Sequence, residues 1–203
     1  MYRRFFKRLF DIIIALLALP FWVLILIIIG PCIYFQDKGS IFYNAPRLGK
    51  DGKIFWMYKF RSMKMNAPDI RNDDGSTFNA EDDPRLTKIG KFIRKTSIDE
   101  TPQLLNVIKG DMSIIGPRPD LPEMLNRYTE YERRKLSVRP GLTGYNQAFY
   151  RNTNDLLGRF KNDIYYIEKV SFGLDIKIFI RTIIVVLKKE NVYRNNDTKS
   201  TKA

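Results

Sequence analysis

The chain has 203 residues, and 35 lysines and arginines against 22 aspartates and glutamates give it a formal net charge of +13. This excess indicates a polyanionic partner: a nucleic acid, an anionic membrane surface or a phosphorylated ligand. The chain has no histidine and one cysteine, Cys32. A histidine base, a histidine-ligated metal, an intrachain disulfide and a cysteine cluster are therefore excluded.

The N-terminal segment combines a basic start with a long apolar run. Four cations lie within the first eight residues, and the run from Ile12 to Phe35 carries no charge. As a helix this run would reach about 36 Å, enough to cross a bilayer core of about 30 Å. The sequence therefore predicts a membrane segment rather than a buried core helix or a cleaved signal peptide.

Two topologies remain open for this segment. Pro20 removes a helix hydrogen bond within the run, and Gly30-Pro31 forms a second break. Both flanks are basic, which favours two cytoplasmic ends and hence a re-entrant hairpin bent at Pro20. A kinked span is the alternative, because prolines are tolerated in transmembrane helices.

The rest of the chain predicts one strand and several helices. The strand is expected at 54–65, a polar turn-rich loop at 66–84, and helices at 86–95, 97–108, 121–138 and 172–189. The last helix is basic and amphipathic, which suits a membrane surface, although a core helix with one solvated side fits the pattern as well. We predict a mostly helical α+β fold with a short β element and interfacial amphipathic helices. Its parts are a membrane anchor at 1–36, a cytoplasmic catalytic domain at 37–190 and a flexible tail at 191–203.

An acidic pair, Asp99-Glu100, is the most informative candidate for chemistry. Ser97 to Glu100 fits a capping box, whereas Pro102 favours a slightly later helix start. In either case both carboxylates lie at a helix N-terminus, where the dipole favours anions, so we expect Asp99 to stay ionised. A simple capping role would also explain the pair.

Several cations are placed to meet a phosphorylated ligand. Arg118 stands between two prolines that hold the backbone extended, and arginine is the preferred bidentate ligand of phosphate. Lys59 and Arg61 share one face of the expected strand, where they would hold a diphosphate. Each feature alone also fits an ordinary surface. Together with the acidic pair and the membrane segment, they indicate an enzyme that acts on a phosphorylated substrate at a membrane face.

The sequence resembles the bacterial sugar transferases, the monotopic phosphoglycosyl transferases that start membrane-linked glycan assembly. The resemblance covers about residues 3–190 and looks like the minimal catalytic form of the family. It rests on KRLFD at 7–11, RLG at 47–49, YKFRSM at 58–63, DPRLTKIGKFIRKTSIDETPQLLNVIKGDMSIIGPRP at 83–119, RPGLTG at 139–144 and DIYYIEKVSFGLDIKI at 163–178.

This resemblance implies transfer of a sugar 1-phosphate from a UDP-sugar to polyprenol (undecaprenyl) phosphate, with release of UMP. Asp99 would attack the β-phosphorus and form a covalent phosphosugar intermediate, and Asp99 and Glu100 would hold Mg²⁺. Substrate-binding positions are expected at Lys59, Arg61, Arg94, Arg118, Gln147 and Arg151. The family's membrane helix is re-entrant, which favours a bend at Pro20 and a catalytic domain on the cytoplasmic face of the inner membrane. A homodimer is compatible with the sequence, and no nucleic-acid partner is expected.

The chain also departs from the family pattern. Leu19-Pro20 replaces the usual Ser-Pro break, and residues 145–151 read YNQAFYR where many members read WAQVNGR. The sequence therefore identifies neither the sugar nor the glycan pathway. Two other readings stay open: a non-enzymatic membrane-anchored binder of nucleic acid or anionic lipid, and a bitopic scaffold with an external C-terminus.

Overall fold

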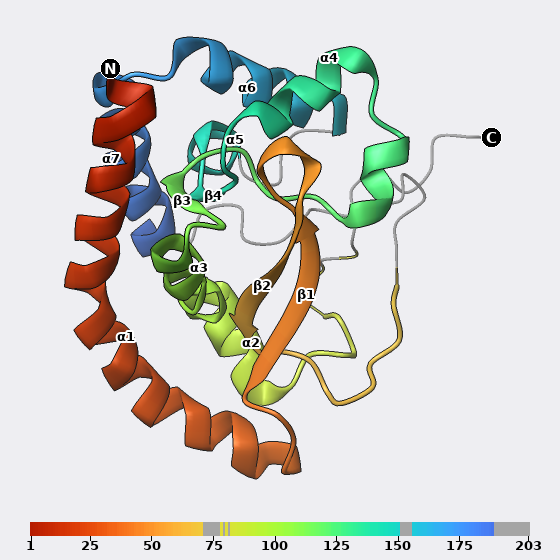
Figure 1. Ribbon diagram of the computed structural model, residues 1–203. Coiled ribbons are helices and arrows are strands. Elements are labelled where there is room, and N and C mark those ends of the chain that lie inside the picture. Colours follow the sequence, from red (N-terminus) through yellow and green to blue (C-terminus); the bar gives the residue numbers. More distant parts are fainter. Residues whose placement is uncertain (71–77, 79, 81, 151–155, 189–203) are drawn as a thin grey trace.

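The computed structural model describes residues 1–70, 78, 80, 82–150 and 156–188. A long curved helix, α1, follows one side of the molecule, and the other elements form a mixed body on its concave side (Figure 1). Most of the described elements are helices, and the strands form two small sheets. The predicted α+β class with mostly helical content is confirmed.

Helix α1 spans Lys7–Asp37, after a π-helical turn at Tyr2–Phe6. It passes through Pro20 and Pro31 without ending at either. The structure thus has one curved helix and not a hairpin with two separate arms at Pro20; the kinked span, the other topology left open by the sequence, also has one continuous helix. A proline inside a helix bends it by removing a hydrogen bond, and the neighbouring turns continue on both sides.

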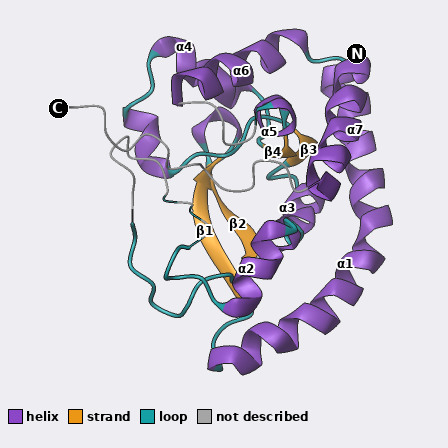
Figure 2. Cartoon of the chain, turned by 180° about the vertical axis from the view of Figure 1, so that it is seen from behind, coloured by secondary structure: helices purple, strands orange, loops and turns teal. Residues whose placement is uncertain are grey.

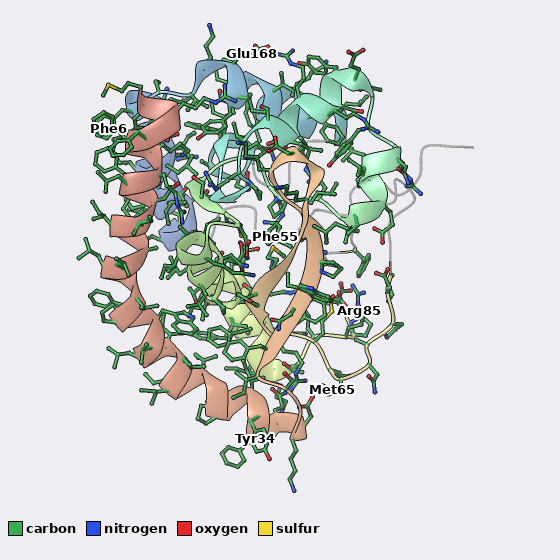
Figure 3. The ribbon with its side chains drawn as sticks, viewed as in Figure 1. Phe6, Tyr34, Phe55, Met65, Arg85 and Glu168 are labelled. Atoms are coloured by element: carbon green, nitrogen blue, oxygen red, sulfur yellow. The ribbon has the colours of Figure 1, made fainter. Side chains whose placement is uncertain are left out.

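The two sides of α1 differ in burial. Its inner side buries Ala15, Trp22 and Ile33 against the body, whereas large apolar side chains such as Leu17 and Leu24 are exposed. The helix is long and apolar enough to cross a membrane, by length and composition. At the two ends of this segment, the side chains of Phe6 and Tyr34 point away from the body (Figure 3). The exposed side therefore has the composition of a membrane-facing surface.

Polar contacts attach both ends of α1 to the same body. Near its start, Lys7 Nζ lies 2.8 Å from Asp175 Oδ2. Asp11 is buried there and accepts a hydrogen bond of 3.0 Å from the backbone N–H of Ile114. At its end, Asp37 forms an ion pair of 2.6 Å with Arg61. The body therefore holds the helix at its first and last turns.

The main sheet is an antiparallel pair, β1 (Phe42–Leu48) and β2 (Ile54–Phe60), with Phe42 opposite Phe60. A 3₁₀ turn at Lys50–Gly52 joins them. A second, parallel pair consists of β3 (Ser113–Ile115) and β4 (Gly141–Thr143). The predicted strand at 54–65 ends earlier than expected, and β1 was not predicted.

Helices complete the body. Their bounds are α2 Lys88–Lys95, α3 Gln103–Lys109, α4 Glu130–Arg133, α5 Tyr145–Phe149, α6 Leu156–Lys169 and α7 Phe172–Lys188. Helix α7 and the end of α2 match the predicted bounds, whereas α5 and α6 were not predicted. The helix predicted at 121–138 is wrong: two 3₁₀ segments, Pro122–Asn126 and Arg134–Ser137, flank the short α4. Thr129 and Glu132 form a capping box that starts a new helix inside this range. The predicted tail at 191–203 lies outside the described residues.

The core joins α1 to the elements that carry the polar motifs. Helix α3 lies between α1 and the β1–β2 ribbon, as seen from both sides (Figures 1 and 2). Trp22 of α1, Met57 of β2 and Val107 of α3 belong to one buried cluster. A second cluster joins Ile33 of α1 to Phe60 and Ile93. Each such side chain contributes about 1.5–3 kcal/mol on burial, so this packing fixes β2 and α3 relative to each other.

Candidate functional site

The acidic pair occupies a 3₁₀ turn, Ile98–Glu100, directly before α3. Asp99 is buried and Glu100 is partly buried. Ser97 enters this turn with a left-handed backbone (φ 58°) and makes no capping hydrogen bond with its side chain. The predicted capping box is therefore wrong, and α3 begins after Pro102, in keeping with the later start.

Glu100 is the centre of an ion-pair cluster. Lys59 Nζ, on β2, donates to Glu100 Oε1 at 2.7 Å, and Arg118 Nη2 donates to the same oxygen at 3.2 Å. Burial opposes ionisation of Glu100, but the two cations outweigh it and hold the pKa of this carboxyl well below its usual range. Glu100 is therefore charged at neutral pH.

Asp99 is in a different electrostatic state from its neighbour. Burial raises the pKa of Asp99 to about 6; Lys59, Arg94 and Arg118 act to lower it, and Glu100 raises it further. The direction is opposite to the one expected from a helix terminus, because desolvation dominates. Within the described part of the chain, no group is hydrogen-bonded to the Asp99 carboxylate. At pH 7 this side chain is therefore mostly ionised although it is desolvated.

The other predicted substrate residues are placed differently from one another. Arg94, in the last turn of α2, donates from Nε to Ser62 Oγ at 3.0 Å and contributes charge to Asp99. Arg61 does not join this cluster. Its guanidinium binds both carboxylate oxygens of Asp37 at 2.6 Å, because β2 ends at Phe60 and the chain turns towards the end of α1.

Gln147 lies on α5, near the start of the Arg118 turn. Its two amide atoms are buried, and neither has a hydrogen-bond partner among the described residues. A Cβ atom on Gly144 would lie 3.0 Å from Gln147 Oε1 and would collide with the carbonyl of Gly116. Buried amides are usually hydrogen-bonded, so the Gln147 amide is an exception within this fold. Arg151 lies outside the described residues.

Asn106 is a residue of this region that the sequence reading missed. It is fully buried on α3 and bonds to the backbone of β2 on both sides of Met57, accepting from Tyr58 N and donating to Trp56 O. Lys59 follows directly along the strand. An asparagine within the apolar stretch LLNVI is the signal that indicates such a buried polar partner.

The donor set limits the kind of metal that the site can hold. In the described part of the chain, no group of three or more carboxylates, cysteines or histidines is clustered. Asp99 and Glu100 offer two adjacent carboxylates, and both described contacts of Glu100 use Oε1. Two carboxylates fit Mg²⁺, which is usually bound by one or two of them together with substrate phosphates and water.

The arrangement suits phosphoryl chemistry. A desolvated carboxylate lies beside three cations, Lys59, Arg94 and Arg118, that act on its charge. Cations in a partly buried site stabilise negative charge that develops on a transferring phosphate far better than they would in water.

Residues 2–189 match the family described as Bacterial sugar transferase. Galactosyl transferase CpsE of Streptococcus agalactiae is 44% identical over 189 residues, which cover 89% of this chain and 42% of that protein. Undecaprenyl-phosphate galactose phosphotransferase of Salmonella typhimurium is 39% identical, over 94% of this chain and 42% of that protein. The uncharacterized sugar transferase EpsL of Bacillus subtilis is 40% identical, over 94% of this chain and 91% of that protein.

The chain thus spans about two fifths of the length of the first two relatives, at 42% each, and nearly all of the third. The matched range contains every described member of the ion-pair cluster. The resemblance inferred from the motifs is confirmed, and the chain belongs to the bacterial sugar transferase family.

Proposed function

We propose that this protein transfers a sugar 1-phosphate from a UDP-sugar to undecaprenyl (polyprenol) phosphate, releases UMP and so starts a membrane-linked glycan. The observation that carries the proposal is the buried carboxylate of Asp99 beside Glu100, with Lys59 and Arg118 on Glu100. The names of two relatives support the acceptor: one, 39% identical, is an undecaprenyl-phosphate galactose phosphotransferase. Another, 35% identical, is a UDP-N-acetylgalactosamine-undecaprenyl-phosphate N-acetylgalactosaminephosphotransferase.

In the first step, an oxygen of the Asp99 carboxylate attacks the β-phosphorus of the donor. A bond forms between this oxygen and the β-phosphorus, the bond from the β-phosphorus to the bridging oxygen breaks, and UMP leaves with that oxygen. The raised pKa of Asp99, about 6, reflects weak solvation of the carboxylate and favours its nucleophilicity. Lys59, Arg94 and Arg118 offset the charge on the transferring group.

In the second step, a phosphate oxygen of the lipid attacks the same phosphorus. The phosphorus–Asp99 bond breaks, and the carboxylate is restored. Dividing the transfer in two lets a soluble donor and a membrane-bound acceptor use one site in turn. Asp99 and Glu100 would hold Mg²⁺ together with donor phosphates; when bound, the ion neutralises phosphate charge.

We also propose that α1 enters the membrane and returns to the same side. The body binds Lys7 at one end of α1 and Asp37 at the other, so both ends lie at the face that carries the body. The exposed side of α1 is apolar, and α7 adds exposed Ile180 and Leu187. The Pro20 region would form the deepest part of the bend. The basic flanks and the UDP-sugar donor assign this face to the cytoplasmic side of the inner membrane.

The test is intact-protein mass spectrometry in detergent with Mg²⁺ and a panel of UDP-sugars, without lipid acceptor. We expect a mass gain of one sugar phosphate in the wild type and none in Asp99→Asn. Undecaprenyl phosphate should then remove the adduct. A wild-type protein that gains no mass and releases no UMP with any donor and acceptor would contradict the proposal. Salt-dependent binding of DNA or RNA would then favour the non-enzymatic binder.

A further inference from the structure

Lys135 is a buried cation outside the predicted sequence motifs. It lies in the 3₁₀ segment Arg134–Ser137 and is 4% exposed. Its ammonium contacts Asp120 Oδ2 at 2.6 Å, Asp163 Oδ2 at 2.9 Å and the backbone carbonyl of Arg118 at 3.1 Å. An ammonium has three N–H groups, so all of its donors are used.

The contact with Arg118 matters because, among the described residues, Lys135 is the hydrogen-bond partner of the Arg118 carbonyl. Pro117 and Pro119 have no N–H, so the backbone of the turn is held through its carbonyl groups, and the Asp120 side chain adds contacts with Lys135, Tyr128 and Arg159. The carbonyl of Pro117 accepts from the backbone of β4, and the carbonyl of Asp120 accepts from the backbone of β1, each at 2.9 Å. The carbonyl of Arg118, between them, accepts from a side chain, that of Lys135.

Packing beneath the turn is incomplete. A small cavity of about 10 Å³ lies between the Pro117–Asp120 turn and Lys135. It has room for about one water molecule. A void of this size supplies few dispersion contacts on the Lys135 side of the turn, where the hydrogen bond from Lys135 attaches the Arg118 backbone.

Arg118 itself needs such support. Its side chain is 44% exposed, and its contact with Glu100 is 3.2 Å, longer than the 2.7 Å contact of Lys59. A long, half-exposed side chain samples many rotamers, so the position of its backbone decides how often the guanidinium reaches Glu100.

We propose that Lys135 is a positioning residue: anchored by Asp120 and Asp163, its ammonium fixes the Arg118 backbone so that the guanidinium meets Glu100 and the transferring phosphate. This inference rests on the proposed function. The competing explanation is that Lys135 only neutralises two buried carboxylates. The two explanations differ in whether a change at Lys135 acts through Arg118.

The experiment is a double-mutant cycle on UMP release. Lys135→Met alone would leave two buried carboxylates without their cation, so it is combined with Asp163→Asn, which removes one negative charge. In this double variant the Asp120 carboxylate still accepts hydrogen bonds from the Tyr128 hydroxyl at 2.6 Å and from Arg159 Nη2 at 3.4 Å. We expect the double variant, Lys135→Met with Asp163→Asn, to lower kcat about tenfold with a smaller change in KM. In an Arg118→Ala background, the same pair should lower kcat by less than about twofold, because its target is already absent.

Tyr128→Phe is the matched control. It removes a 2.6 Å hydrogen bond to the same Asp120 and leaves the bond to the Arg118 carbonyl. It should lower Tm while kcat stays within about twofold of the wild type. If the pair does not fold, Lys135→Arg retains the charge but changes the donor geometry, and it should give the same loss of kcat and the same dependence on Arg118.

Unchanged kcat in the variants, losses that multiply with Arg118→Ala, or an equal loss in Tyr128→Phe would each overturn the positioning role while wild-type turnover upholds the proposed function. A wild-type protein that releases no UMP would overturn the proposed function, and this inference with it.

Discussion

Asn106 on α3 bonds to the backbone on both sides of Met57 in β2, accepting from Tyr58 N at 2.9 Å and donating to Trp56 O at 2.8 Å. The amide thus pairs with the edge of the strand as a neighbouring strand would. Helix α3 follows directly after Glu100, and Lys59 follows Tyr58. The Asn106 contact therefore fixes the distance between the two partners of the Lys59–Glu100 ion pair.

We predict that Asn106→Leu lowers both stability and turnover. A partly buried N–H and a partly buried C=O of β2 would lose their partner, at up to about 1–3 kcal/mol each. The movement of Lys59 should lower kcat about tenfold. Asp111→Ala is the control. Asp111 accepts a hydrogen bond of 3.2 Å from the same Asn106 Nδ2, but it is not part of the contact with β2. Comparable kcat in the two variants would contradict the role assigned to Asn106.

Asp99→Asn should stabilise the protein while it abolishes activity. The pKa of Asp99 is raised from 3.8 to about 6, so the folded state holds the proton more tightly than the unfolded state. The resulting stability is fully present below pH 3.8 and is lost as the pH rises through 6. At pH 7–8 the ionised side chain therefore costs about 3 kcal/mol, and its removal should raise Tm by roughly 6–12 °C.

The measurement is Tm against pH in detergent with EDTA, so that no metal contributes. The gain in Asp99→Asn should shrink as the pH falls from 6 towards 4. Glu100→Gln is the paired control with the opposite sign. The pKa of Glu100 is lowered, so its ionised form stabilises the fold at neutral pH, and its replacement should lower Tm there. If Asp99→Asn and Glu100→Gln shifted Tm equally and in the same direction, the pKa values of the two carboxyls would not be displaced in opposite directions.

Lys59→Met should move the acid limb of the pH–activity profile to higher pH. After burial, Lys59 has the largest effect on the pKa of Asp99 and lowers it, so its loss raises that pKa further. A larger fraction of Asp99 is then protonated at pH 7, and the nucleophile is depleted. The kcat should also fall about tenfold or more, because a cation at the transferring phosphate is removed.

The measurement for this prediction is kcat/KM between pH 5 and 9. Lys91→Met is the control, since Lys91 is an exposed cation on α2 with the same change of charge. Its acid limb should stay where the wild type has it. A Lys59→Met profile with an unmoved acid limb would mean that Asp99 is not the group that titrates.

The sequence predicted the acidic pair and three of its cations because short motifs carry them: IDE, the YKF of β2, the FIR of α2 and PRP. The prediction for Arg61 was wrong because it extended the alternation of the strand past Phe60. The strand ends there, and Arg61 forms an ion pair with Asp37 at the end of α1. The prediction for 121–138 was wrong because a capping box at Thr129 outweighs the amphipathic pattern. Asn106 was missed for another reason. Its partner in the strand, Tyr58, is 48 residues away in the sequence, and a pattern of neighbouring residues does not reveal a contact over that separation.

The topology of α1 gives the last prediction. The body binds both Lys7 and Asp37, so the two ends of α1 should be accessible from one side of the membrane. The test uses three single-cysteine variants in a Cys32→Ser background: Arg3→Cys, Ser40→Cys and Leu17→Cys. Arg3 and Ser40 flank the two ends of α1, and Leu17 lies on its exposed apolar side. A membrane-impermeant maleimide should label the two end positions in inside-out vesicles and not in intact spheroplasts. Leu17→Cys should react in neither, because the hydrocarbon core excludes a charged reagent.

A kinked span gives a different pattern, with one end labelled from each side. Since Arg3 and Ser40 lie outside the ion-pair cluster, UMP release in both variants should stay within about twofold of the wild type, which verifies that the labelled protein is folded. Labelling of the two ends from opposite sides in an active protein would require one of the contacts, Lys7–Asp175 or Asp37–Arg61, to be broken in the membrane. The variants Lys7→Met and Asp37→Asn would then identify which one, because loss of an already broken contact leaves Tm unchanged.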